Sequence, residues 1–125
     1  MSMTLLLLLI LLLCVSTVLI VWSLPSKQRK ENALRNSSNK EFIRAAEYLG
    51  RTDKIKENKD KLKFYGLYKQ ALEGDNKTPK PTNIFDQKAR MKWEAWTLEK
   101  GKSKDQASLE YVQLLSSKVP NWRDH

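Results

Sequence analysis

Residues 62–71 read LKFYGLYKQA, and this run carries the pattern around which the remaining helices can be arranged. Its side chains recur every three or four residues, which predicts a helix over about residues 60–73. Phe64, Leu67 and Ala71 form one apolar stripe of this helix, and the adjoining side carries Leu62, Tyr65, Tyr68, Lys69 and Leu72. Because two phenols and an ammonium group are costly to bury, we expect their polar ends at the rim of the core.

Similar patterns on both sides predict three further helices, and strand signals are weak. The four helices are expected over about residues 38–50, 60–73, 86–100 and 103–118. Ser38 with Glu41 and Ser103 with Gln106 have the spacing of capping boxes, and Asp86 is a third candidate cap. Pro79 and Pro81 predict an extended connection between the second and third helices. The fold class is therefore all-α, and the long connection favours a crossover bundle over up-down-up-down.

The third helix carries cations beside aromatic rings, namely Lys88, Arg90 and Lys92 next to Trp93 and Trp96. Rings and cations together suit a ligand with a flat heterocycle and phosphates, since the heterocycle stacks and the ammonium groups pair with phosphate oxygens. The tryptophans are assigned to the core in preference to ligand contact. General nucleic-acid binding is the rival interpretation of so basic a chain.

The chain has 125 residues, a formal net charge of +9, one Cys and one His. One Cys excludes a disulfide framework and a Cys-rich zinc site. The single His is the last residue, His125, so the composition offers little for a His-based active site. No Ser-His-Asp, Cys-His or metal-ligand cluster is evident, and we expect a protein that is not an enzyme and holds no metal or cofactor.

Residues 3–24 contain no charged side chain and are long enough for a helix to span a bilayer core of about 30 Å. We expect an uncleaved transmembrane anchor in residues 1–24, with a cleaved signal peptide as the alternative. Residues 25–38 form a basic linker, and its Lys27, Arg29 and Lys30 predict that residues 39–125 face the cytosol. The expected location is a single-pass protein of the endoplasmic reticulum; secretion is the alternative.

Several blocks in residues 39–125 closely resemble the acyl-CoA-binding protein family. They are residues 62–71 (LKFYGLYKQA), 74–81 (GDNKTPKP), 92–96 (KWEAW) and 101–104 (GKSK), with Phe42, Ala45, Ala46, Ala107 and Tyr111. The resemblance covers the whole segment that follows the linker. It implies a four-helix up-down-down-up bundle that binds long-chain acyl-CoA thioesters without chemical change.

The family's binding positions map individually onto this sequence. Tyr65, Tyr68 and Lys69 resemble the residues that hold the nucleotide end, with the Tyr68 ring packing on adenine. Lys69 and Lys92 match the lysines that engage the ribose 3′-phosphate, and Tyr111 matches the tyrosine of the last helix. Gly66 and Leu67 fall inside the binding stretch, where Leu67 is expected to serve packing. Many members have a Lys where this chain has Gly50, and the neighbouring Arg51 is a candidate substitute.

The leading hypothesis is thus a monomeric, membrane-tethered carrier and buffer of long-chain acyl-CoA in lipid transport and fatty acid metabolism, with no nucleic-acid partner. Its acyl chain would lie in a groove lined by Phe42, Ala45, Leu49 and Leu62. One alternative is a secreted or lumenal lipid binder, which glycosylation of the sequon at Asn76 would favour. The other is a basic helical module for nucleic acid or protein.

Overall fold

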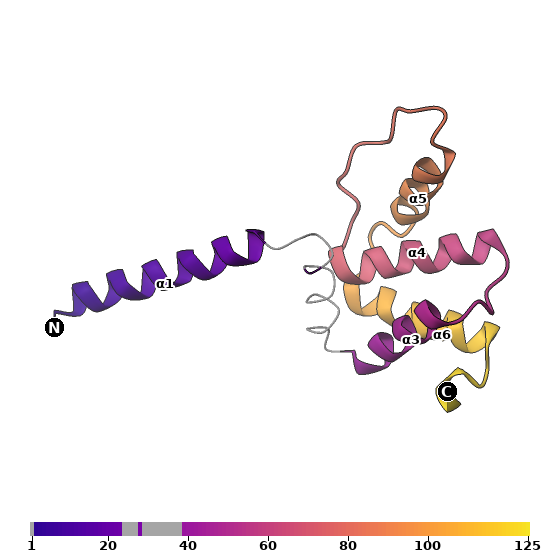
Figure 1. Cartoon of the computed structure of the whole chain (residues 1–125), viewed down its shortest axis with the longest axis horizontal. Coiled ribbons are helices and arrows are strands. Elements are labelled where there is room, and N and C mark those ends of the chain that lie inside the picture. The colour runs from indigo at the N-terminus through magenta and orange to yellow at the C-terminus, as the bar shows by residue number, and fades with distance from the viewer. Residues whose placement is uncertain (1, 24–27, 29–38) are drawn as a thin grey trace. The chain divides into compact units, whose positions relative to one another are not determined.

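The computed structural model describes residues 2–23, 28 and 39–125, in two compact units, Met1–Arg35 and Asn36–His125 (Figure 1). The first unit contains α1, Met3–Ser23, which has no charged residue. Among the residues described, no helix is both long enough and apolar enough to cross a membrane. The transmembrane anchor predicted for residues 1–24 is therefore not confirmed. Apart from Gln28, the linker predicted for residues 25–38 lies outside the described residues.

The second unit is all-α over its described residues, as predicted. Its helices are α3 (Lys40–Arg51), α4 (Asn58–Glu73), α5 (Gln87–Thr97), α6 (Lys104–Lys118) and the short 3-10 helix η1 (Trp122–Asp124). In Figure 1, α4 lies between α5 on one side and α3 with α6 on the other. The four predicted helices are present, and η1 was not predicted.

Side-chain caps begin three of these helices. Asp86 accepts a hydrogen bond from the Ala89 amide, and the Ser103 hydroxyl accepts one from the Gln106 amide, as predicted. The expected start at Ser38 is wrong, because Asn39 caps α3 through the Phe42 amide at 3.0 Å. Asparagine is among the preferred N-cap residues, and Asn39 lies three residues before Phe42, which is the spacing of a capping hydrogen bond.

The ends of two helices show how the chain turns. α4 ends at Gly74, which has φ of +77°, as its glycine predicts. The predicted extension of α5 to residue 100 is wrong: the helix stops at Thr97. Residues 98–102 instead form turns with bonds of the shorter i→i−3 type, and Gly101 with φ of +91° closes them.

Contacts between residue pairs along α4 show whether α5 and α6 run parallel or antiparallel to it. Lys92 of α5 lies over the Tyr65 ring and Trp96 lies beside Lys69, so both helices advance together by one turn and run parallel. In contrast, Lys118 at the end of α6 pairs with Asp60 at the start of α4, so these two run antiparallel. This is the down-down-up part of the topology that the family resemblance implied.

The core is built of aromatic and aliphatic side chains from all four helices and η1. Its fully buried members are Phe42, Ala45, Phe64, Leu67, Ala107, Leu115 and Trp122. Trp96 is buried too, which confirms its assignment to the core, whereas Trp93 is half-buried. Trp122 anchors the C-terminal residues: its indole donates to the Ser116 hydroxyl at 3.0 Å, and the neighbouring Arg123 pairs with Glu41 at 2.6 Å.

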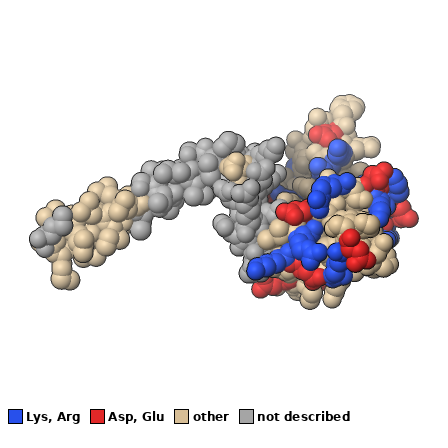
Figure 2. Space-filling view, turned by 60° about the horizontal axis from the view of Figure 1, so that its bottom comes forward, with Lys and Arg blue, Asp and Glu red and all other residues tan. Residues whose placement is uncertain are grey.

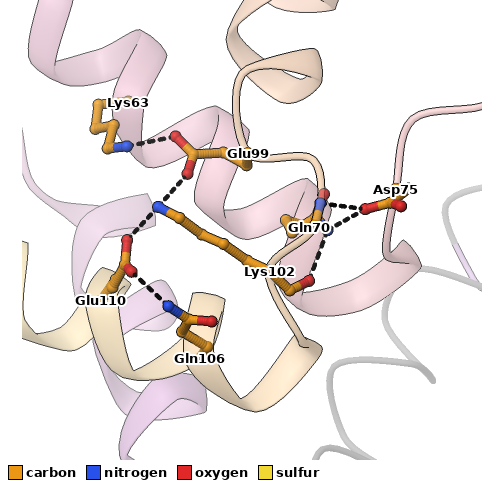
Figure 3. Close-up of polar contacts among 8 residues, drawn as sticks. Lys63, Gln70, Asp75, Glu99, Lys102, Gln106 and Glu110 are labelled. Carbon is orange, nitrogen blue, oxygen red and sulfur yellow. Dashed lines mark hydrogen bonds and ion pairs between the residues drawn. The ribbon is translucent and has the colours of Figure 1, made fainter.

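A buried carboxylate holds the turn between α5 and α6 against α4 (Figure 3). Glu99 is 1% exposed and accepts from Lys63 at 2.5 Å and Lys102 at 2.6 Å. Lys102 also reaches Glu110 on α6 at 2.5 Å. Burial by itself raises the pKa of Glu99, yet the hydrogen bonds and charges of the two lysines outweigh it and hold that pKa below its ordinary value. Glu99 is thus charged and fully paired at neutral pH.

α4 and α5 approach closely at Gly66. A Cβ atom at this position would lie 2.3 Å from the backbone oxygen of Ala95. Because that atom belongs to the backbone of another helix, only a shift of α4 against α5 could relieve the contact. At Gly50, by comparison, a Cβ atom would meet nothing within 4 Å.

These two glycines give a matched test of the packing. We expect Gly66→Ala to lower the free energy of unfolding by about 2 kcal/mol, since overpacking outweighs the gain in helix propensity. Gly50→Ala should leave it unchanged or raise it by up to about 0.5 kcal/mol. Urea unfolding of both variants measures this, and equal effects at the two positions would refute the close-approach argument.

The Glu99 network predicts a pH dependence of stability. A carboxyl group with a depressed pKa stabilises the fold above its unfolded-state pKa, and this contribution is lost as pH falls through the folded-state value. Glu99→Gln should cost about 2 to 3 kcal/mol at pH 7, because it removes the partner of two lysines. The variant should also lose less stability than the parent below about pH 4.5. Urea titrations across the acid range check this, with Glu110→Gln as the more exposed control; parallel pH profiles would contradict it.

Candidate functional site

Three of the predicted site residues line one open groove of about 500 Å³, namely Tyr65 and Tyr68 of α4 and Tyr111 of α6. Tyr111 is buried at its floor, edge-on to Phe42 and Phe64, with ring centroids 5.2 and 5.1 Å away. The remaining lining comes from α3, α4 and the segment between them: Leu49, Thr52, Asp53, Ile55, Lys56, Lys61 and Phe64.

The two inner tyrosines of this groove are held in their neutral form. Burial raises the pKa of the Tyr111 hydroxyl far above its usual value near 10. Burial, followed by the charge of Glu73, raises the pKa of Tyr68 as well. Both phenols therefore keep their proton over the physiological range and can donate hydrogen bonds to an anionic or carbonyl oxygen.

The predicted lysine of α5 lies on the other side of Tyr65. The Nζ atom of Lys92 is 5.0 Å from the centroid of the Tyr65 ring. Tyr65 and Lys92 both line a second groove of about 700 Å³ between α4 and α5. The rest of its lining is Asn58, Lys61, Leu62, Gln87, Lys88 and Met91. Since Tyr65 and Lys61 line both grooves, the two form adjacent parts of one surface along α4.

Lys69 already forms an ion pair and a contact with an aromatic ring. Its ammonium group pairs with Glu73 one turn later and lies 4.4 Å from the centroid of the Trp96 ring. The side chain is only 13% exposed, so it is fixed in place rather than swinging in solvent. A phosphate that reached Lys69 would have to compete with the Glu73 carboxylate.

Four other predicted residues lie apart from these grooves. Gly66 and Leu67 are buried in the packing of α4, and Leu67 is 1% exposed, which fits the packing role expected for it. Gly50 is exposed at the end of α3. Arg51 lines a separate groove of about 470 Å³ with Tyr48, Lys54 and His125, and its role as a phosphate ligand stays a prediction.

The apolar lining expected for an acyl chain is only partly in place. Leu49 lines the tyrosine groove and Leu62 lines the groove between α4 and α5. Phe42 and Ala45 are 0% exposed and lie in the core, so neither offers surface to a ligand in this conformation. Phe42 instead supports the site from beneath, with its ring 6.1 Å from that of Tyr68.

Sequence reasoning overlooked two lysines of the tyrosine groove, Lys56 and Lys61. Lys61 precedes Tyr65 by four residues and Tyr68 by seven, so the helical period places it on the same face. That spacing could have identified it. Lys56 lies between α3 and α4, where no periodicity gives a direction, and it pairs with Asp53 at 2.9 Å.

The long connection after α4 is pinned beside the site. The side-chain amide nitrogen of Asn76 donates to the backbone carbonyl of Trp93 at 3.3 Å and to the Thr97 hydroxyl at 3.0 Å. The Trp93 indole donates to the Thr78 carbonyl at 2.9 Å, and the Trp96 indole to the Gly74 carbonyl at 2.8 Å. These bonds fix the tryptophans that flank Lys92 and Lys69.

Side chains of both signs are interspersed over the face of the second unit seen in Figure 2. Many lysines are neutralised by carboxylates, so the uncompensated cations matter more than the total charge. No group of three or more His, Cys, Asp or Glu within the described residues could hold a metal ion. The arrangement offers aromatic faces, hydroxyl donors and ammonium groups along α4, which suits recognition of a phosphate-bearing heterocycle rather than metal chemistry.

Residues 39–115 match the family described as "Acyl CoA binding protein". The chain is 38% identical over 84 residues to an "Acyl-CoA-binding protein homolog" of Drosophila melanogaster, a match that covers 67% of this chain and 96% of that relative. An "Acyl-CoA-binding protein" of Saccharomyces cerevisiae is 48% identical over 61 residues, or 49% of this chain and 69% of the yeast protein.

A solved structure gives the same result for the fold. The crystal structure of Oryza sativa Acyl-CoA-Binding Protein 2 superimposes with a TM-score of 0.59 at 40% sequence identity. The match covers 67% of this chain and 92% of the rice chain. The matched region makes up almost the whole of the fruit fly chain and of the rice chain.

Proposed function

The chain belongs to the acyl-CoA-binding protein family, a family of non-catalytic binding proteins, and we propose that residues 39–125 carry and buffer long-chain acyl-CoA thioesters inside the cell. The observation that supports this most directly is the pair of adjacent grooves along α4. Tyr65, Tyr68 and Tyr111 line the first, and Lys92 borders the second. By their resemblance to the family's pattern, these four residues are the ones that we assign to the nucleotide end of the ligand.

The chemistry of the ligand fits both parts of this surface. The CoA head carries about four negative charges near neutral pH, and ammonium groups neutralise phosphates through charge-assisted hydrogen bonds. Lys61 and Lys92 lie beside tyrosine faces on which a purine can stack. The acyl chain gains up to about 0.8 kcal/mol for each CH₂ removed from water, and Leu49, Leu62 and Met91 offer apolar surface for it.

We further propose that α1 tethers this domain to a membrane. This proposal rests on the sequence, since none of the described helices qualifies as a membrane span. Residues 3–24 contain no charged side chain, and at about 1.5 Å per residue a helix over that stretch would equal a bilayer core of about 30 Å. The side chains of residues 5–13 are between 45% and 65% exposed. The basic residues that follow, Lys27, Arg29 and Lys30, favour a domain on the cytosolic side, and the endoplasmic reticulum is the membrane that we propose.

The surroundings of Asn76 also favour the cytosolic orientation. A lumenal domain would offer the sequon Asn76-Lys77-Thr78 for glycosylation. The Asn76 amide nitrogen, however, donates two hydrogen bonds to α5, and its carbonyl accepts from the amide and hydroxyl of Thr78. A glycan would replace one of the two hydrogens on that nitrogen and so remove one of the two bonds that pin the connection beside α5, which makes this asparagine better suited to structure than to modification.

We expect residues 39–125 to bind palmitoyl-CoA tightly and free palmitate poorly, because palmitate lacks the phosphates and adenine that the lysines and tyrosines recognise. Isothermal titration calorimetry measures both affinities on the same preparation. Absence of palmitoyl-CoA binding by the folded domain would overturn the proposed function.

The Lys69–Glu73 pair makes a sharper test of the site. Lys69→Met should weaken palmitoyl-CoA binding by about tenfold or more, since it removes a charged hydrogen-bond donor to phosphate. Glu73→Gln should strengthen binding by about twofold to fivefold, because the phosphate then meets no competing carboxylate. Lys118→Met, which breaks a pair with Asp60 outside both grooves, is the control and should bind as the parent does. Equal affinities for the Lys69 and Glu73 variants would refute the role of Lys69.

The tether is tested on the full chain with a C-terminal tag. We expect the protein to stay in membranes after carbonate extraction and its domain to be degraded when protease is added to intact membranes. Release by carbonate would contradict the anchor. Protection from protease, or a glycan at Asn76, would contradict the cytosolic orientation.

A further inference from the structure

The connection between α4 and α5 presents two large apolar side chains to solvent. Phe85 is 89% exposed and Ile84 is 66% exposed, directly before the first turn of α5. In Figure 1 this connection forms the edge of the second unit on the α5 side of α4. Side chains this exposed add little to the stability of the fold, because neither Phe85 nor Ile84 is part of the core.

The exposure does not come from a loose loop. The Phe85 amide donates to the Asn83 side chain at 3.0 Å, and the Asp86 amide donates to the Asn83 carbonyl at 3.2 Å. Asp86 in turn caps α5. Pro79 and Pro81 stiffen the approach to this turn. The turn therefore holds Ile84 and Phe85 outward in a defined position.

Basic residues flank this apolar tip along the chain. Residues 77–92 contain five cations, Lys77, Lys80, Lys88, Arg90 and Lys92, and one acidic residue, Asp86, a balance of +4. The whole of residues 39–125 has 19 Lys and Arg against 13 Asp and Glu, or +6, so most of the excess lies in this short segment. Within the described residues, Lys77 and Lys88 are exposed and form no ion pair.

Apolar side chains at a fixed turn, flanked along the chain by lysines, match the two layers of an anionic bilayer surface. Phe and Ile enter the boundary between headgroups and acyl chains, while the lysines pair with anionic headgroups. We propose that Ile84, Phe85 and the exposed cations Lys77 and Lys88 form a docking surface for anionic membranes. This contact is independent of α1, because it belongs to the folded domain itself.

The tip lies next to the groove between α4 and α5, so membrane docking would affect access to that groove. Gln87, Lys88, Met91 and Lys92, which follow the tip in α5, line the groove between α4 and α5. Docking through Phe85 would bring that groove to the bilayer surface, where an acyl chain passes between lipid and protein. This consequence rests on the proposed function, whereas the docking itself does not.

Residues 39–125, produced without α1 and checked for cooperative unfolding, are tested by flotation with vesicles. We expect binding to vesicles of phosphatidylcholine mixed with phosphatidylserine, weak binding to phosphatidylcholine alone, and release as salt is raised. A domain that ignores phosphatidylserine vesicles at low salt would overturn the proposal.

Matched variants assign the contact to the tip. The double variant Ile84→Ser with Phe85→Ser should weaken binding to the mixed vesicles by about tenfold, because it removes the apolar side chains that enter the bilayer. Leu109→Ser, on an exposed leucine of α6 that is 53% exposed, is the control and should bind like the parent. Equal losses in both would show general stickiness of exposed apolar residues and refute the assignment.

Charge reversal tests the basic part in the same way. Lys77→Glu should weaken vesicle binding by at least about fivefold, and Lys54→Glu, outside residues 77–92, should weaken it less. Palmitoyl-CoA titration of the double tip variant separates the two proposals. Retained ligand affinity with lost vesicle binding supports a docking surface distinct from the ligand site. Loss of both would refute that distinction.

Discussion

The close approach of α4 to α5 at Gly66 is the constraint on which the site depends. Without a side chain at this position, the helix backbones come near enough for Tyr65 to meet Lys92 and for Lys69 to meet Trp96. Any larger residue would meet the Ala95 carbonyl and move the two helices apart. A glycine in a helix interior lowers helix stability by about 1 kcal/mol relative to alanine, so packing here outweighs propensity.

The lysines of the second unit divide into two groups that composition alone does not distinguish. Lys63, Lys102 and Lys118 pair with carboxylates of other elements and stabilise the arrangement of helices. Lys61 and Lys92 instead line grooves beside tyrosine rings. The basic total suggested nucleic-acid binding as a rival, but charges of both signs are interspersed over the face seen in Figure 2, and Lys61 and Lys92 line grooves together with tyrosine rings.

Local patterns predicted the parts of this fold that depend on local physics. The caps Asp86 and Ser103 and the glycine end of α4 follow from hydrogen bonds within a few residues, and all three are as expected. The candidate tyrosines Tyr65, Tyr68 and Tyr111, named from the resemblance, lie together in one groove. Sequence could not place the buried Glu99, since its partner Lys63 comes from α4, 36 residues away along the chain. Nor could it show that Phe42 and Ala45 are closed off, which depends on how α3 packs.

An amphiphilic ligand requires polar and apolar surfaces that face solvent side by side, which a fold normally buries or pairs. In this domain such exposed groups belong to residues that other contacts hold in place. Lys69 is held by Glu73 and Trp96, Tyr111 is buried among rings, and the turn around Phe85 is pinned by Asn83. Because these side chains are ordered before any ligand or bilayer arrives, binding loses little conformational entropy in them. The close packing of α4 on α5 at Gly66 and the ion pairs of Glu99 hold the helices together at positions outside both grooves, so the polar and apolar groups that line the grooves can stay exposed.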